Sequence, residues 1–192
     1  MDFIKHFLAV GTLSLLFILP AFGSGYVNPD FSTKIYKNIL VYVPASDIEF
    51  REKFEGFMVK RLSNESTKAI TSISVFPPYK QFTKTELVKE AADRNIDAFL
   101  LIEPADAQEK SPPFPFNTYK LNSNQFNMSH LATKRHTEMT AVITIYDVAS
   151  SGIAWTGAVT LKTDGDDMLK DISKKIASEI HKTNLVENVE KK

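Results

Sequence analysis

The chain has 192 residues, 43% of them hydrophobic and 24% charged, which is enough for one globular domain with a sizeable core. Lys plus Arg and Asp plus Glu number 23 each, and this balance argues against nucleic-acid binders and polybasic membrane-surface proteins. There is no cysteine, which excludes disulfides, thiol nucleophiles and cysteine metal sites.

The amino terminus has the pattern of an export signal. A short basic region precedes an apolar run over residues 7–19, and Ala21 and Gly23 then form an A-x-A-like cleavage site. This pattern predicts a signal peptide over residues 1–23 and a mature protein that is periplasmic or secreted. The alternative is an uncleaved anchor, although the run is too short to span a bilayer as a helix.

After an expected extended linker over residues 24–36, the pattern predicts an α/β domain over residues 37–186. The apolar, β-rich stretch 38–44 predicts a buried strand. Ser46 and Glu49 then match a capping box, with Ser46 as the N-cap of a helix. That helix has an apolar face made of Phe50, Phe54, Phe57, Met58 and Leu62.

Two more strands flank a second helix. Residues 69–76 predict a strand that two prolines stop, and residues 96–104 predict another. Thr83 and Glu86 form a second capping box, and the helix is expected to end near Asn95, a residue that tolerates left-handed backbone. The order predicts a parallel βαβαβ core with right-handed crossovers, whose helices cover one face of the sheet.

Residues 105–136 break this rhythm with a long loop rich in Pro and Phe. The prolines favour polyproline II, a conformation that loses little entropy on docking. The alternatives are that the aromatic residues fold back over the core, or that part of the loop forms an extra edge strand. The aromatic residues predicted to bind a partner are Phe114, Phe116, Tyr119 and Phe126.

An antiparallel β-hairpin and a carboxyl-terminal helix complete the domain, before a short tail over residues 187–192. Residues 137–148 and 153–162 alternate apolar and polar side chains around a Ser–Gly turn. Trp155 shares the apolar face with Ile153, which favours a core role over ligand contact. The last helix has an acidic start and an apolar stripe made of Leu169, Ile172, Ile176 and Ile180.

Several of these stretches resemble a known group of proteins. The pattern R-x-x-F-E beginning at Arg51, "NIDAFLLI" in the third strand, "IYDVASSGIAW" in the hairpin and "KTNLV" at the end of the last helix resemble small bacterial envelope proteins, many of them uncharacterised lipoproteins. Their α/β domain is similar to the TolB amino-terminal domain and to the periplasmic domain of the curli-export lipoprotein CsgG. The resemblance implies a non-enzymatic periplasmic domain that binds other envelope components. This chain lacks the lipid-bearing cysteine, which favours a soluble periplasmic protein.

The chain contains no nucleophile elbow, P-loop, H-E-x-x-H or G-x-G-x-x-G motif. His130 and His136 are able to bind zinc or copper, but a few scattered histidines are common in exported chains. An acidic cluster at Asp164, Asp166 and Asp167 lacks the spacing of an EF-hand, and capping of the last helix explains it. We therefore expect no metal and no cofactor.

A ligand pocket, if present, is expected at the carboxyl ends of the parallel strands. The residues predicted there are Asp47, Arg51 and Glu55 at the start of the first helix and Glu103 at the end of the third strand. Arg51 and Glu55 stand one helical turn apart on the flank and are able to pair. The alternative role of these groups is capping and salt bridging.

Together these patterns predict an exported, non-enzymatic protein that binds or assembles unidentified envelope proteins. Nucleic acid is excluded as a partner, while peripheral membrane association and the oligomeric state stay open. One alternative is a small-ligand carrier or a hydrolase with its pocket at the strand ends. Another is a secreted factor that acts on a host.

Overall fold

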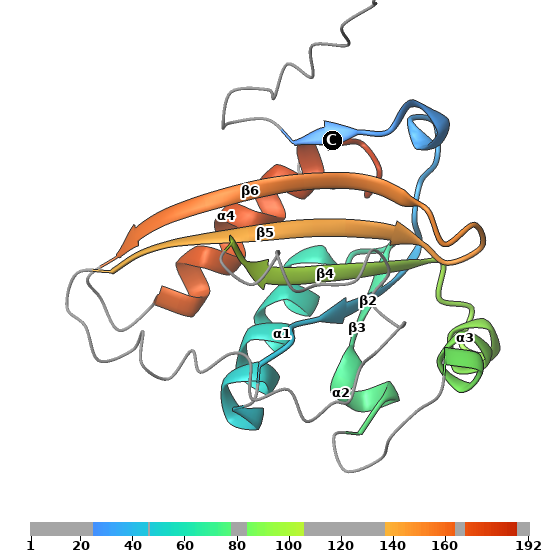
Figure 1. The fold of residues 1–192 in the computed structure, drawn as a ribbon, viewed down its shortest axis with the longest axis horizontal. Coiled ribbons are helices and arrows are strands. Elements are labelled where there is room, and N and C mark those ends of the chain that lie inside the picture. The colour runs from blue at the N-terminus through green and yellow to red at the C-terminus, as the bar shows by residue number, and fades with distance from the viewer. Residues whose placement is uncertain (1–24, 46, 78–83, 106–136, 164–167, 188–192) are drawn as a thin grey trace, which may run out of the picture.

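The computed structural model describes residues 25–45, 47–77, 84–105, 137–163 and 168–187. They form an α/β fold on a single six-stranded sheet with the strand order β1-β6-β5-β4-β2-β3 (Figure 1). The predicted fold class is confirmed, because a parallel core is followed by an antiparallel hairpin and a carboxyl-terminal helix.

Three parallel strands form one half of the sheet. β2 (Asn38–Tyr42) lies between β3 (Lys68–Thr71) and β4 (Ala98–Pro104) and pairs parallel with both. β5 (Thr137–Asp147) and β6 (Ile153–Thr163) form the antiparallel hairpin, and β5 extends the sheet from β4. The predicted hairpin is therefore confirmed, with its turn over residues 148–152.

The helices cover both faces of the sheet, so the prediction of one covered face is wrong. α1 (Ile48–Leu62) and α4 (Met168–Lys182) pack side by side on one face (Figure 1). Residues from α2 (Ser72–Val75) and α3 (Lys84–Asp93) pack on the other. The physical reason is that β2 and β4 are apolar at nearly every central position, so both of their faces need a cover.

The side chains of β2 show this division into two cores. Ile39 and Val41 point into the larger core beneath α1 and α4, whereas Leu40 points into the smaller one. The predicted stripe of α4 is confirmed, since Ile172, Ile176 and Ile180 are fully buried and Leu169 packs against them partly buried. The smaller core consists of Leu40, Val75, Phe76, Ala91, Ile96, Phe99, Leu101 and Tyr146.

The second strand is shorter than predicted. β3 ends at Thr71, and the apolar residues that prolong the strand pattern, Val75 and Phe76, belong to a helical turn and the bend after it. The turn forms because the N–H of Ile73 donates to a buried carboxylate on α1 and the hydroxyl of Ser74 donates to the carbonyl of Thr71. Both apolar side chains then reach the smaller core.

The first helix has a different N-cap from the predicted one, whereas the second helix ends as predicted. α1 begins after Asp47, whose carboxylate accepts a hydrogen bond from the N–H of Phe50 at 3.0 Å, so Asp47 is the N-cap in place of Ser46. Ser46 and Thr83 lie outside the described residues. Asn95 has a φ of 54°, which confirms the predicted left-handed end of the second helix.

The segment expected to be a linker contributes to the sheet. β1 (Tyr26–Val27) pairs antiparallel with β6, and the short 3₁₀ helix η1 (Pro29–Phe31) follows it. The N–H of Asn28 continues this pairing by donating to the carbonyl of Ala154 at 2.9 Å. Two residues are too few to give a recognisable strand pattern, so the sequence offered no signal for this edge strand.

The burial of Trp155, which is 2% exposed in the larger core, confirms its predicted structural role. Its predicted neighbour Ile153 is 40% exposed. The difference follows from a register shift opposite Ile145 and Tyr146, which gives the inward place to Ala154 instead.

Candidate functional site

The carboxyl ends of β2 and β3 meet at a buried carboxylate. Glu55 of α1 is fully buried, and its Oε1 accepts hydrogen bonds from Arg51 Nε at 2.9 Å, from Ser72 Oγ at 2.6 Å and from the N–H of Val43 at 3.2 Å. Its Oε2 accepts from the N–H of Ile73 at 3.3 Å. One side chain of α1 therefore ties together the ends of two strands.

Arg51 is the cation of this network and is 4% exposed. Its Nη2 donates to Ser72 Oγ at 2.5 Å, and its guanidinium lies over the ring of Tyr42 at 4.9 Å from the centroid. The pairing of Arg51 with Glu55 was predicted, but not its burial, because their spacing alone places them on the helix flank. We call Arg51, Glu55 and Ser72 the buried triad.

Two tyrosines lie within electrostatic reach of Glu103, near the end of β4. Burial raises the pKa of Tyr42 to about 12, against the opposing charge of Arg51 and with smaller contributions from Glu55 and Glu103. Burial also raises the pKa of Tyr146 to about 12, with a further contribution from Glu103. Glu103 is 6% exposed, so it is another carboxylate held inside this end of the sheet.

The structure therefore brings three of the four predicted ligand-binding residues to one end of the sheet. Arg51 and Glu55 bond to each other, and Glu103 lies close enough to act on the same tyrosine as they do. Asp47 instead caps α1. Ligand binding by these residues stays a prediction. Sequence reasoning missed Ser72, which occupies an ordinary position of a β-rich run.

A second network holds the turn end of the hairpin. The carboxylate of Asp147, 1% exposed, accepts from Lys34 Nζ, from Tyr36 Oη at 3.3 Å, and from the N–H and Oγ of Ser150 at 2.8 Å each. Burial alone would raise the pKa of Asp147, but the hydrogen bonds from Lys34 and Ser150 outweigh it and hold the pKa below the ordinary value. Burial and the same carboxylate raise the pKa of Tyr36.

We expect Asp147→Asn to lower the free energy of unfolding at pH 7 by about 1–3 kcal/mol, because charge-assisted hydrogen bonds become neutral ones. Because the pKa of Asp147 is lower in the folded protein than in the unfolded chain, where it is near 3.8, its charge stabilises the fold above pH 3.8. This stabilisation is lost as the pH falls through the pKa of the folded state. Urea unfolding of both proteins at pH 7 and pH 3 checks this. The difference in free energy of unfolding between the two proteins should be smaller at pH 3 than at pH 7. A difference that does not change with pH would contradict the role of the Asp147 charge.

Several predicted groups lie outside the described residues: the partner-binding Phe114, Phe116, Tyr119 and Phe126, the histidines His130 and His136, and the acidic cluster at Asp164, Asp166 and Asp167. Among the residues that the structure describes, no three His, Asp or Glu side chains gather where they would hold a metal ion. No described helix has the length and apolar character needed to cross a membrane.

No protein-family model and no curated protein matches the chain. Among solved structures, PelC from Paraburkholderia phytofirmans, a dodecamer, is 9% identical with a TM-score of 0.47 and is matched over 86% of this chain and 96% of its own. Lipoprotein GNA1162 from Neisseria meningitidis is 13% identical with a TM-score of 0.40, over 74% of this chain and 95% of its own.

TolB from Acinetobacter baumannii is also similar, at 9% identity and a TM-score of 0.41. The match covers 83% of this chain and 30% of the TolB chain. TolB is one of the proteins whose domain the sequence was predicted to resemble. At these identities the likeness is one of fold.

Proposed function

We propose that this protein is an exported, non-enzymatic binding protein of the bacterial envelope. In this proposal it engages another envelope protein by pairing an extended segment of that protein with the outer edge of β6. The observation that carries the proposal is the length of β6 that β1 leaves uncovered. The export pattern of residues 1–23 supports the location.

The outer edge of β6 is mostly free of neighbouring strands in the described part of the chain. β6 has 11 residues, but β1 pairs only with Trp155 and Thr156. Residues 157–163 pair with β5 on one edge, and no strand of the described residues pairs with their outer edge. A strand edge of this kind is a surface on which an extended peptide gains main-chain hydrogen bonds.

The direction of the backbone groups on this edge follows from one contact. The carbonyl of Thr160 accepts a hydrogen bond from Lys175 Nζ at 2.6 Å, and Lys175 lies on α4 rather than on β5. Backbone groups alternate in direction along an antiparallel strand, so those of Ala158 also point away from β5. Ala158 is exposed, and its N–H and C=O are thus offered to a partner.

The opposite edge of the sheet is closed by its own side chains. On β3, the N–H of Ala69 donates to Ser63 Oγ at 3.1 Å, and the carbonyl of Thr71 accepts from Ser74 Oγ at 2.7 Å. These two residues carry the outward-facing backbone groups of the strand. Both outward residues of β3 are bonded by side chains, whereas along residues 157–163 of β6 only the carbonyl of Thr160 is bonded in this way among the described residues, and this contrast supports β6 as the binding edge.

The buried triad supports a non-enzymatic role. Both oxygens of Glu55 and the guanidinium of Arg51 are already bonded to groups of the chain itself, in a water-excluded place. Such an arrangement joins α1 to two strands and leaves its members bonded to one another rather than to a substrate.

The test is a pair of substitutions at position 158. Ala158→Pro removes the outward N–H and leaves the ladder to β5 intact, so the fold should persist while strand addition fails. Ala158→Thr keeps the N–H and favours an extended backbone, and it is the matched control. In native size-exclusion of gentle cell extracts, wild-type and Thr variants should elute in a complex and the Pro variant as free protein. A complex that survives in a folded Pro variant would reject the proposal.

A further inference from the structure

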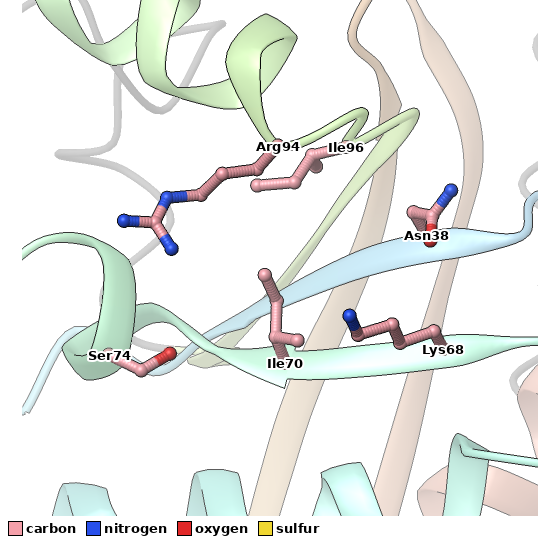
Figure 2. Close-up of a pocket in the computed structure, with 6 residues that line it drawn as sticks. All are labelled: Asn38, Lys68, Ile70, Ser74, Arg94 and Ile96. Carbon is pink, nitrogen blue, oxygen red and sulfur yellow. The ribbon is translucent and has the colours of Figure 1, made fainter.

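A separate cavity of about 230 Å³ lies on the α2 and α3 side of the sheet. Figure 2 shows Arg94, just after α3, and Lys68, on β3, reaching into this space from different elements. Ile70 and Ile96 lie between them. The lining residues are Asn38, Lys68, Ile70, Ser74, Arg94 and Ile96.

Among the described residues, the lining of this cavity contains two cations and no carboxylate. Arg94 has one ion pair, to Glu90 of α3 at 3.3 Å, in which both side chains are largely solvated and the attraction is therefore weak. Lys68 is exposed and makes no ion pair with any residue that the structure describes. The nearby carboxylate of Asp97 instead accepts from the backbone N–H groups of Lys37 and Asn38.

The cavity also has an apolar part, and its volume limits the size of a ligand. Ile96 is 4% exposed and Ile70 is half-buried, so both offer hydrocarbon surface beside the cations. Ser74 and Asn38 add hydrogen-bonding groups at the rim. A volume of about 230 Å³ lies below the range of drug-sized pockets, and it suits a ligand of only a few carbon atoms.

From this geometry we infer that the cavity between β3 and α3 binds a short-chain carboxylate. Lys68 and Arg94 offer a cation on either side of the cavity for the carboxylate, and the hydrocarbon stem lies on Ile70 and Ile96 between them. The same chemistry is offered by a free short-chain acid and by the carboxyl-terminal residue of a peptide. This inference does not depend on the outer edge of β6.

Titration of the isotope-labelled protein, followed by NMR of its backbone amides, tests this with four probes. Pentanoate should shift the amides of Ser74, Arg94 and Ile96, with binding in the millimolar range or tighter. Pentanamide lacks the charge and inorganic phosphate lacks the stem, so each should bind at least tenfold more weakly. A tetrapeptide ending in leucine with a free carboxyl group is the fourth probe: binding tighter than that of pentanoate identifies a peptide terminus as the source, and weaker binding identifies a free acid.

Two variants make the assignment specific. Lys68→Gln with Arg94→Gln removes both charges from exposed positions and should weaken pentanoate at least tenfold without changing stability. Lys60→Gln, on the exposed side of α1, removes a charge elsewhere and should leave binding unchanged. Absence of shifts at the cavity, equal binding of pentanamide or phosphate, or full binding by the double variant would each overturn the inference.

Discussion

Replacing Glu55 by alanine should lower the free energy of unfolding by about 3–5 kcal/mol, the cost of leaving a buried charge without its partner. Arg51 is 4% exposed and Glu55 fully buried, so water reaches neither group to compensate. The same substitution removes the acceptor for Ser72 Oγ and for the N–H groups of Val43 and Ile73. Urea unfolding followed by circular dichroism measures the loss.

The same helix supplies a matched control. Glu49 and Lys53 form an ion pair with the identical i,i+4 spacing and a 2.6 Å contact, but both side chains are exposed. Glu49→Ala should therefore cost at most about 0.5 kcal/mol. Arg51→Met combined with Glu55→Gln should cost less than Glu55→Ala alone, because no uncompensated charge stays buried. If Glu55→Ala and Glu49→Ala lowered the free energy of unfolding equally, the stabilising role of the buried triad would be contradicted.

Trp155→Ala should destabilise the fold by about 3–5 kcal/mol, because it removes the largest buried side chain of the core. The indole ring also leaves no room for a side chain at positions 25 and 157. A Cβ added to Gly157 would stand 2.4 Å from the ring, and one added to Gly25 would stand 2.3 Å from its Nε1. The ring occupies the space where a side chain at either glycine would lie. Gly157→Ala should therefore lower the free energy of unfolding by about 1–3 kcal/mol through overpacking.

Gly56 is the matched control for this effect. A Cβ there meets no atom within 4 Å, and the residue lies on the exposed face of α1. Gly56→Ala should therefore stabilise the protein by about 0.5–1 kcal/mol, opposite in sign to Gly157→Ala. Trp155→Leu together with Gly157→Ala should cost less than the sum of the two changes, since the smaller side chain makes room for the methyl group. An additive result would contradict the packing account.

The fold was largely predictable because its main signals are local. Alternation over the hairpin and continuous apolar runs in β2 and β4 report directly on burial. Ile153 was wrongly predicted to face the core because of a register shift opposite Ile145. The shift arises from the pairing of two strands, so the pattern of one strand does not reveal it. The two-residue β1 is held by its pairing with β6, which no local pattern records.

The candidate site was predictable only in part. The spacing of Arg51 and Glu55 predicted their contact, because it depends on one helix alone. Their burial depends on β2 and α2, whose ends approach the pair from elsewhere in the chain. The cavity of Lys68 and Arg94 is likewise formed by residues that lie 26 positions apart, and neither residue stands in a motif.

Photo-crosslinking in the cell tests the central claim most directly. A photoreactive amino acid is placed at Ala158 on the open edge of β6 and, as a control, at Lys60 on the exposed side of α1. The account predicts a discrete adduct with one envelope protein from position 158 and none from position 60. No adduct from position 158, the same adducts from both positions, or an adduct only with a second copy of this chain would contradict it.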